Sequence, residues 1–354
     1  MTARERVITA LNNKKPDRIP RYEIFLPDFV NHWREIKRVG NDANIYDWYP
    51  KIDIGAVLAT QEGPFIGQKC TKEIDDDIYW ERNSWGILKR YNRSGYFFEV
   101  LETAIKEKGD LDKLQFEDPH DPTRYADIVA HEKSIHDRFA PVSGVMGLFM
   151  PSWYLRGEIP FLMDLVDDEQ FCRALVEKIA AFLTVVGENV LRYTNTWNTA
   201  IWVYDDFGTN QTTLISPGVF ERIFLIPYKK MISYWKSKGA QNIILHFDGN
   251  SLPVMDLLLE AGFTGVQGVY PTTGMTIPAV KAKYGKRLSL IGGMCNIHIL
   301  SKGTHQNIER EVKSIVEVAK DGGVIIGAHS VDRTISLENY DYYYDVLEKL
   351  DKTW

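Results

Sequence analysis

The sequence contains only three cysteines among 354 residues, Cys70, Cys172 and Cys295, and no two of them show the short spacing of a metal-binding pair. Such a sparse, odd set predicts reduced thiols and no disulfide framework, as in intracellular proteins. No run of 18 uninterrupted apolar residues is present, and residues 1–6 lack the apolar core of a signal peptide. We therefore expect a cytoplasmic protein with no membrane-spanning segment.

An excess of positive charge is also lacking. The 42 lysines and arginines are outnumbered by 48 aspartates and glutamates, which gives a net charge of −6. Nucleic acids and anionic membranes reward clustered basic residues, so neither is expected as the main partner. The sequence has no glycine-rich phosphate loop and no Gly-x-Ser-x-Gly nucleophile motif. These absences direct attention to other kinds of site.

Apolar runs that are typical of buried parallel strands alternate with longer amphipathic stretches. The eight runs cover 20–26, 54–60, 142–148, 200–204, 242–247, 265–269, 288–292 and 323–327, and the later helical patterns cover 218–238, 252–261, 276–284 and 307–319. Eight strand–helix units favour a (β/α)8 TIM-type barrel over the alternative, an open doubly wound sheet. We expect one α/β barrel domain over residues 1–354; a homo-oligomer is compatible with it.

The segment 62–93 departs from this alternation. It is polar and aromatic, and it predicts an irregular excursion with a hairpin around Tyr79–Tyr91 rather than a plain strand–helix unit.

In a barrel of this kind, functional groups lie just after the carboxyl ends of the strands. His246 and Asp248 follow the fifth strand two positions apart, so their side chains face the same way. Cys295 follows the seventh strand and His329 the eighth. Two imidazoles, a carboxylate and a thiol on one arc of the rim predict a site for a metal ion. The alternative is a hydrogen-bonding or acid–base cluster without a metal.

Other polar and aromatic side chains follow the fourth and sixth strands. Tyr204 and Asp206 come at the end of the fourth strand, where only one of the adjacent carboxylates 205 and 206 can face the mouth. Asp206 is expected to orient substrate or act as a base, unless it merely caps a turn. Gln267 and Tyr270 belong to the sixth unit and are expected to contact substrate. Their alternative role is packing, inside the barrel and over a loop.

The segment after the third strand carries Trp153, Tyr154 and Arg156, which predict an aromatic wall and a cation. The remaining histidines lie in helical or loop stretches and are expected to be structural or superficial: His32, His120, His131, His136, His298 and His305.

Several segments, taken in order, resemble the uroporphyrinogen-decarboxylase superfamily. They are RERV at 4–7, KPDRIP at 15–20, DDFGTN at 205–210 with ISP at 215–217, LHFDGN at 245–250, GGMC at 292–295, GG at 322–323 and EN at 338–339. The resemblance covers nearly the whole chain and implies a (β/α)8 barrel, in agreement with the strand count.

The superfamily contains two chemistries. The decarboxylases carry an arginine-rich stretch after the first strand that binds substrate carboxylates, whereas this chain has YEIFLPD at 22–28. The other branch comprises corrinoid-dependent methyltransferases, whose zinc is held by His-x-Cys after strand five and Cys after strand eight. His246 matches the first ligand, and Asp248 and His329 stand at the two cysteine positions. The resemblance therefore favours the methyltransferase branch.

A His/Asp/His set is harder than a thiolate set and leaves zinc more positive, so the ion is a stronger Lewis acid toward oxygen. This implies metal-assisted O-demethylation of a methoxylated, aromatic substrate, as in the methoxyaryl methyltransferases. Cys295 is expected as a fourth ligand or neighbour, and Trp153 and Tyr270 as the aryl pocket. No corrinoid-binding Asp-x-His-x-x-Gly segment occurs in this chain, so the corrinoid is expected on a separate protein.

Three alternatives stay open at this point. The first is transfer of methyl from a methylcorrinoid to a thiol or to tetrahydrofolate, the second is uroporphyrinogen decarboxylation, and the third is a non-catalytic barrel that binds a tetrapyrrole or a corrinoid partner.

Overall fold

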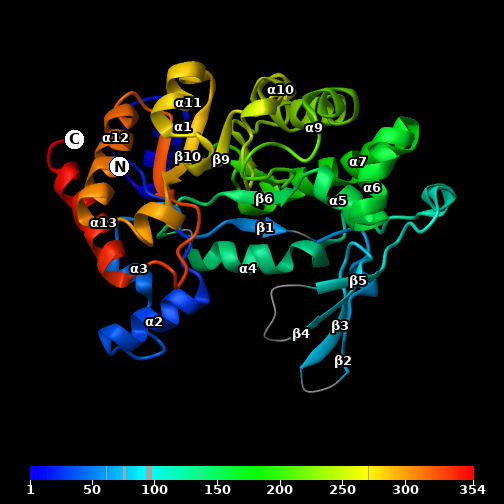
Figure 1. The fold of residues 1–354 in the computed structure, drawn as a ribbon, viewed down its shortest axis with the longest axis horizontal. Coiled ribbons are helices and arrows are strands. Elements are labelled where there is room, and N and C mark those ends of the chain that lie inside the picture. Colours follow the sequence, from blue (N-terminus) through cyan, green and yellow to red (C-terminus); the bar gives the residue numbers. More distant parts are fainter. Residues whose placement is uncertain (61, 75–76, 93–97, 136, 270) are drawn as a thin grey trace.

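The core of the protein is a parallel sheet that curves into a barrel (Figure 1). The computed structural model describes residues 1–354 except 61, 75–76, 93–97, 136 and 270. Seven parallel strands pair in the order β1-β6-β7-β8-β9-β10-β11. Their bounds are β1 Leu58–Thr60, β6 Ser143–Met146, β7 Ile201–Tyr204, β8 Ile243–His246, β9 Gly265–Val269, β10 Ser289–Met294 and β11 Val324–Ala328.

The eighth position in the barrel belongs to the segment 20–26, which makes parallel bridges to both edges of the sheet. Arg21 bridges to Ile326 of β11, and Tyr22 bridges to Ile54, just before β1. The amide of Tyr22 donates to the carbonyl of Ile326 at 2.8 Å, and the amide of Glu23 donates to that of Ile54 at 3.1 Å. These bonds close the sheet, so the predicted (β/α)8 barrel is confirmed and the open doubly wound sheet is excluded.

Helices surround the strands, as the ribbon shows (Figure 1). Their bounds are α1 Ala3–Leu11, α2 Pro27–Lys37, α3 Ile45–Trp48, α4 Ala126–Ile135, α5 Phe149–Arg156, α6 Glu158–Asp167, α7 Glu169–Thr194, α8 Pro217–Val219, α9 Leu225–Ser237, α10 Met255–Ala261, α11 Ile277–Tyr284, α12 His305–Ala319 and α13 Leu337–Asp351. Short 3-10 or π turns cover Ile66–Gln68, Lys108–Lys113, Pro122–Tyr125, Phe220–Phe224, Leu252–Val254, Pro271–Thr273, Gly285–Arg287 and Asn296–Leu300. The four later helices expected from the sequence are all present.

The barrel interior is filled by side chains at every second strand position. Tyr22, Trp202, Ile244 and Ile325 belong to one buried cluster inside the strands. Helix α1 packs its buried residues Val7, Ala10 and Leu11 into the same cluster, near the beginnings of the strands. The interior is therefore closed at its N-terminal end, and only the opposite end, where the strands finish, is available for chemistry.

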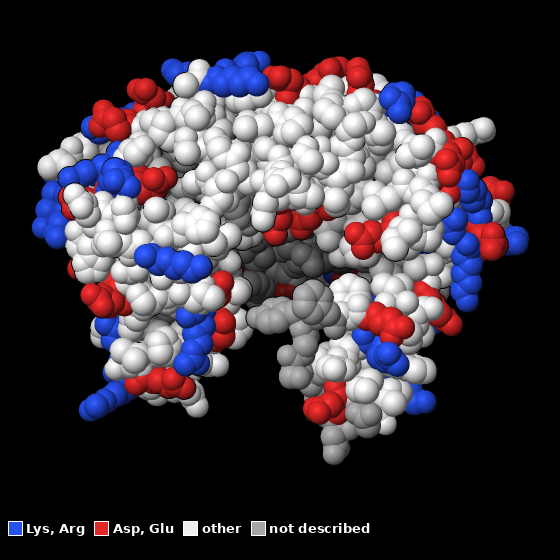
Figure 2. Space-filling model, viewed as in Figure 1, with Lys and Arg blue, Asp and Glu red and all other residues white. Residues whose placement is uncertain are grey.

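The excursion after β1 is a separate antiparallel sheet. Its strands are β2 Cys70–Glu73, β3 Ile78–Arg82, β4 Leu88–Asn92 and β5 Phe98–Glu102, paired in chain order. The hairpin predicted around Tyr79–Tyr91 is present, because β3 and β4 pair with Tyr79 opposite Tyr91. The sheet projects from the barrel at the lower right of Figure 1, opposite the α2–α3 segment. Figure 2 shows a hollow between these two projections, with acidic side chains at its upper rim.

Among the residues that the structure describes, no helix combines the length and the apolar character that crossing a bilayer requires.

Candidate functional site

The side chains at the barrel mouth continue the period-two pattern of the interior. Trp202 and Ile244 are buried inside the barrel, and two residues later Tyr204 and His246 end their strands. The strand register pairs Tyr204 with His246 and His246 with Gln267. The uppermost layer of the interior is therefore a phenol, an imidazole and an amide side by side, where lower layers are apolar.

Three potential ligands of one cation meet above this layer. One ligand atom from each of His246, Asp248 and His329 lies within 4.8 Å of the others. Nε2 of His329 is 3.0 Å from Oδ1 of Asp248, and Nε2 of His246 is 3.8 Å from the same oxygen. The centroids of the two imidazole rings are 5.2 Å apart. Two imidazole nitrogens and a carboxylate oxygen are a donor set of catalytic zinc, which keeps one position for substrate. The residues present therefore fit a zinc ion.

Gln267 connects the two imidazoles. Its side chain is fully buried; Oε1 makes a short hydrogen bond with Nδ1 of His246, and Nε2 is 3.5 Å from Nδ1 of His329. The next residue, Gly268, has φ +98° and is the extra residue of a bulge between β9 and β10. A Cβ there would lie 2.2 Å from the carbonyl oxygen of Phe247, so glycine is required for this bulge beside Gln267.

The environment keeps His246 neutral. Burial, and then the nearby His329, lower the pKa of His246 to about 4, against the opposing effects of Asp248 and the hydrogen bond with Gln267. A neutral imidazole has a lone pair for a metal, so this ring is in the ligating protonation state at neutral pH.

The adjacent carboxylates of Asp205 and Asp206 face opposite ways, as the strand geometry predicts. Asp205 is fully buried and accepts hydrogen bonds from the amides of Leu148, Phe149 and Met150, at 2.8–3.1 Å. It therefore caps the beginning of α5. Asp206 is half-buried and its Oδ1 accepts from the amide of Asp248 at 2.8 Å. Burial, and then the charge of Asp248, raise the pKa of Asp206 to about 7.

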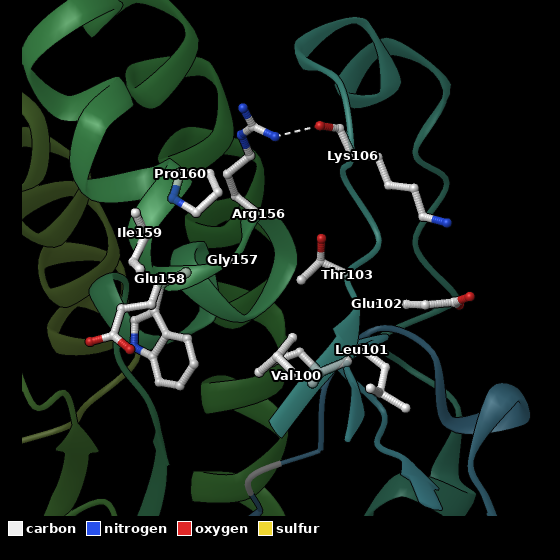
Figure 3. Close-up of a pocket in the computed structure, with 12 residues that line it drawn as sticks. Val100, Leu101, Glu102, Thr103, Lys106, Arg156, Gly157, Glu158, Ile159 and Pro160 are labelled. Atoms are coloured by element: carbon white, nitrogen blue, oxygen red, sulfur yellow. Dashed lines mark hydrogen bonds between the residues drawn. The ribbon is translucent and has the colours of Figure 1, made fainter. Parts of the chain in front are cut away.

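The aromatic residues named from the sequence lie in different places. The ring of Tyr204 packs against that of His246, with centroids 4.7 Å apart. Tyr270 lies outside the described residues. Trp153 lines a cavity of about 560 Å³ between α5–α6 and β5, whose labelled residues in Figure 3 include Val100, Arg156 and Ile159.

Tyr154, the next residue of α5, lines a different cavity, together with Met146 at the end of β6. Burial, and then the charges of Asp206 and Asp205, raise the pKa of the Tyr154 phenol to about 12. The position of Trp153 follows from the helix, because consecutive residues of α5 point about 100° apart. Arg156, expected as a cation for the site, instead pairs with Asp164 at 2.8 Å.

Cys295 is not part of the ligand group found among the described residues. Its buried Sγ accepts from the amide of His298 at 3.4 Å, so the thiol caps the π turn at Asn296–Leu300. Cys295 therefore lies outside the group of three, and its role as a fourth ligand or neighbour stays a prediction. The other described histidines also lie outside the group; they are His32, His120, His131, His298 and His305. His136 is outside the described residues.

Comparisons with known proteins agree with the architecture. The family model described as uroporphyrinogen decarboxylase (URO-D) matches residues 98–350, well over half of the chain. A solved structure titled "methyltransferase from Methanosarcina mazei" is similar in fold, with a TM-score of 0.68 and 13% identity over 99% of both chains.

A sugar phosphate isomerase/epimerase from Parabacteroides distasonis also aligns, over 94% of this chain and 96% of its own, but at 8% identity and a TM-score of 0.35 the likeness is weak. No curated protein matches the sequence. The match of the family model decides the assignment, and the chain belongs to the uroporphyrinogen decarboxylase (URO-D) family.

Proposed function

We propose that the protein is a methyltransferase that moves a methyl group from a methoxylated aromatic compound to the Co(I) of a corrinoid carried by a separate protein. The observation that carries the proposal is the His246, Asp248 and His329 group, whose ligand atoms lie within 4.8 Å at the barrel mouth. Family membership and the fold shared with a protein titled methyltransferase support it.

His246, Asp248 and His329 would hold a zinc ion. When bound, zinc supplies Lewis acidity toward the ether oxygen, where negative charge develops as the methyl group leaves. The transfer would use the electron pair of Co(I) to form a bond between cobalt and the methyl carbon, which takes cobalt formally to Co(III). It would break the bond between the methyl carbon and the ether oxygen and leave that electron pair on the oxygen. An oxygen-directed site agrees with the absence of thiolates from the group, because carboxylate and imidazole ligands neutralise less of the ion's charge than two thiolates do.

The residues around the group orient its ligands and the substrate, and they provide a surface for the aromatic ring. Oε1 of Gln267 accepts from Nδ1 of His246, which leaves the lone pair of the His246 Nε2 for a metal on the side of Asp248. The amide nitrogen of Gln267 lies 3.5 Å from Nδ1 of His329, beside that ring. Asp206 holds the backbone of Asp248 and orients the substrate. Tyr204, packed on His246, and Tyr154 provide aromatic surface for the aryl ring.

Metal analysis with an anaerobic transfer assay tests the proposal. The purified protein should contain about one zinc per chain and should demethylate 3-methoxybenzoate in the presence of a Co(I) corrinoid. His246→Ala and His329→Ala should each lose zinc and at least ~100-fold in rate, because the group then has too few ligands. His120→Ala, which removes an exposed imidazole outside the group, is the matched control.

Two results would reject the proposal. If the protein transfers methyl only from a methylcorrinoid to a thiol or to tetrahydrofolate, and not from a methoxylated compound, the alternative reaction is supported instead. Unchanged demethylation by His246→Ala and His329→Ala would show that the group is not the reactive centre.

A further inference from the structure

A second cavity lies between the antiparallel sheet and the barrel. It has a volume of about 260 Å³, and its walls include Glu81 and Lys89 from the sheet and Met146 and Tyr154 from the barrel. Met146 is the last residue of β6, and Tyr154 is on α5, directly after that strand. Because active groups of a barrel lie after the strand ends, this cavity is next to the mouth.

Lys89 is an unusual residue in this cavity. Its side chain is half-buried, and its Nζ lies 4.4 Å from the ring centroid of Phe98 and 5.9 Å from that of Tyr154. No ion pair of Lys89 occurs among the described residues, and burial lowers the pKa of its ammonium, against the opposing effect of the Glu81 charge. A half-buried ammonium in contact with aromatic faces, with a carboxylate acting on it only from beyond ion-pair distance, pays a desolvation cost that a directly bonded anion would offset.

The carboxylates of the cavity have other partners. Glu81, opposite Lys89 in the β3–β4 register, accepts a short hydrogen bond from the hydroxyl of Tyr91. Glu62 pairs with Lys69 at 2.5 Å. Because the Tyr91 hydroxyl is neutral, Glu81 keeps its charge and partly balances that of Lys89, but it makes no ion pair with Lys89 among the described residues. The Lys89 ammonium therefore keeps hydrogen-bond donors for a ligand.

Tyr154 connects the cavity with the candidate metal centre. Its ring lines the cavity beside Lys89, together with Met146 at the end of β6. Met146 pairs with Tyr204 in the β6–β7 register, and the ring of Tyr204 packs against that of His246. An aromatic compound lying along Tyr154 would thus have one end toward Lys89 and the other toward the His246, Asp248 and His329 group.

We propose that this cavity is the subsite for an anionic substituent, a carboxylate, on the aromatic substrate, with the Lys89 ammonium donating to it and Tyr154 packing against the ring. The proposal rests on the proposed function and narrows its substrate class to methoxylated aromatic acids. It adds a specificity-determining residue from the antiparallel sheet, outside the barrel strands.

Equilibrium binding tests the subsite without methyl transfer. Isothermal titration of the full-length protein would compare 3-methoxybenzoate with 3-methoxybenzyl alcohol, which keeps the methoxy group and lacks the charge. Wild type should bind the acid more tightly, and Lys89→Met should weaken binding of the acid about 10- to 100-fold, the range for a hydrogen bond to a charged group. Affinity for the alcohol should change less than about twofold.

Two further variants make the test specific. Lys89→Arg keeps the charge and should retain the preference for the acid. Lys72→Met, on exposed strand β2, removes a lysine of the same sheet that is not part of the cavity and should leave both affinities unchanged. Equal wild-type affinity for the two probes, or equal weakening of both by Lys89→Met, would overturn the subsite.

A kinetic assay of methyl transfer from the same two compounds distinguishes failure of the subsite from failure of the proposed function. A charge preference in binding with no methyl transfer from either compound would leave the subsite standing and overturn the methyltransferase. Demethylation of both compounds at equal kcat/KM, unaffected by Lys89→Met, would support the methyltransferase and overturn the subsite.

Discussion

Glu23 provides a prediction that depends on the fold alone. Its carboxyl group is 2% exposed, on the side of the first barrel strand that faces α13. Oε2 accepts from the amide of Ala328 at 3.3 Å, while the nearby Arg21 already pairs with Glu348 and Asp351. Burial raises the pKa of Glu23 to about 8, against smaller opposing effects of Tyr343, the Ala328 amide and Arg21. The folded protein therefore keeps a proton on Glu23 at neutral pH.

The unfolded chain loses that proton near its usual pKa of 4.5. Between pH 4.5 and 8 the folded state binds one more proton than the unfolded state, so stability falls as pH rises through this window. The slope is at most about 1.4 kcal/mol per pH unit. From pH 5 to pH 8 this amounts to roughly 3 kcal/mol.

Glu23→Gln removes the titration and keeps the shape. Urea unfolding of both proteins at pH 5, 6, 7 and 8 should show similar stability at pH 5 and a growing advantage of the variant, up to roughly 3 kcal/mol at pH 8. Glu221→Gln, on an exposed position, is the control and should follow wild type. Parallel pH profiles of wild type and Glu23→Gln would refute the assignment of a buried, protonated carboxyl group.

Three further predictions concern single residues. Asp205→Ala should lower the free energy of unfolding by about 3 kcal/mol, because it removes the acceptor of the Phe149 and Met150 amides at the start of α5, while the Leu148 amide keeps the Tyr228 hydroxyl; a loss below about 1 kcal/mol on urea unfolding would contradict this. Gln267→Leu should weaken zinc binding about 10- to 100-fold in chelator competition, and unchanged affinity would show that the imidazoles are oriented without it. Gly187→Ala should destabilise by about 1–3 kcal/mol despite better helix propensity, because its Cβ would lie 2.2 Å from the buried Trp235 ring; a raised melting temperature would contradict the packing argument.

Much of the mouth could be predicted from the sequence because strand periodicity and strand ends are local features. Trp202 and Ile244 mark the interior phase of their strands, and counting two residues onward reaches Tyr204 and His246. The same rule separates Asp205 from Asp206, which the structure places on opposite sides. Where a site residue continues a buried strand, the alternation of side chains along that strand is sufficient to predict which way the residue faces.

Residues on helices and in the antiparallel sheet could not be predicted this way. Which of Trp153 and Tyr154 lines the cavity beside the end of β6 depends on where α5 begins, and Asp205, from another strand, caps that beginning. Lys89 reaches the barrel through the position of β4, which is a long-range contact with no local pattern. Gln267 was named as a substrate contact, and its link to both imidazoles required the bulge at Gly268.

The two imidazoles and the carboxylate of the His246, Asp248 and His329 group are held in position in different ways. This difference predicts which of the three side chains zinc binding depends on most. His246 and His329 are largely buried and are both held by Gln267, so their positions do not need a metal to define them. The Asp248 side chain is half-exposed and lies on the segment after β8, where its backbone amide donates to Asp206 and its carboxylate contacts both imidazoles. Losing an imidazole should therefore remove the site, whereas Asp248→Asn, which keeps an oxygen donor and loses the charge, should retain a weakened one. Equal loss of zinc from all three variants would show instead that the carboxylate charge is as necessary as either ring.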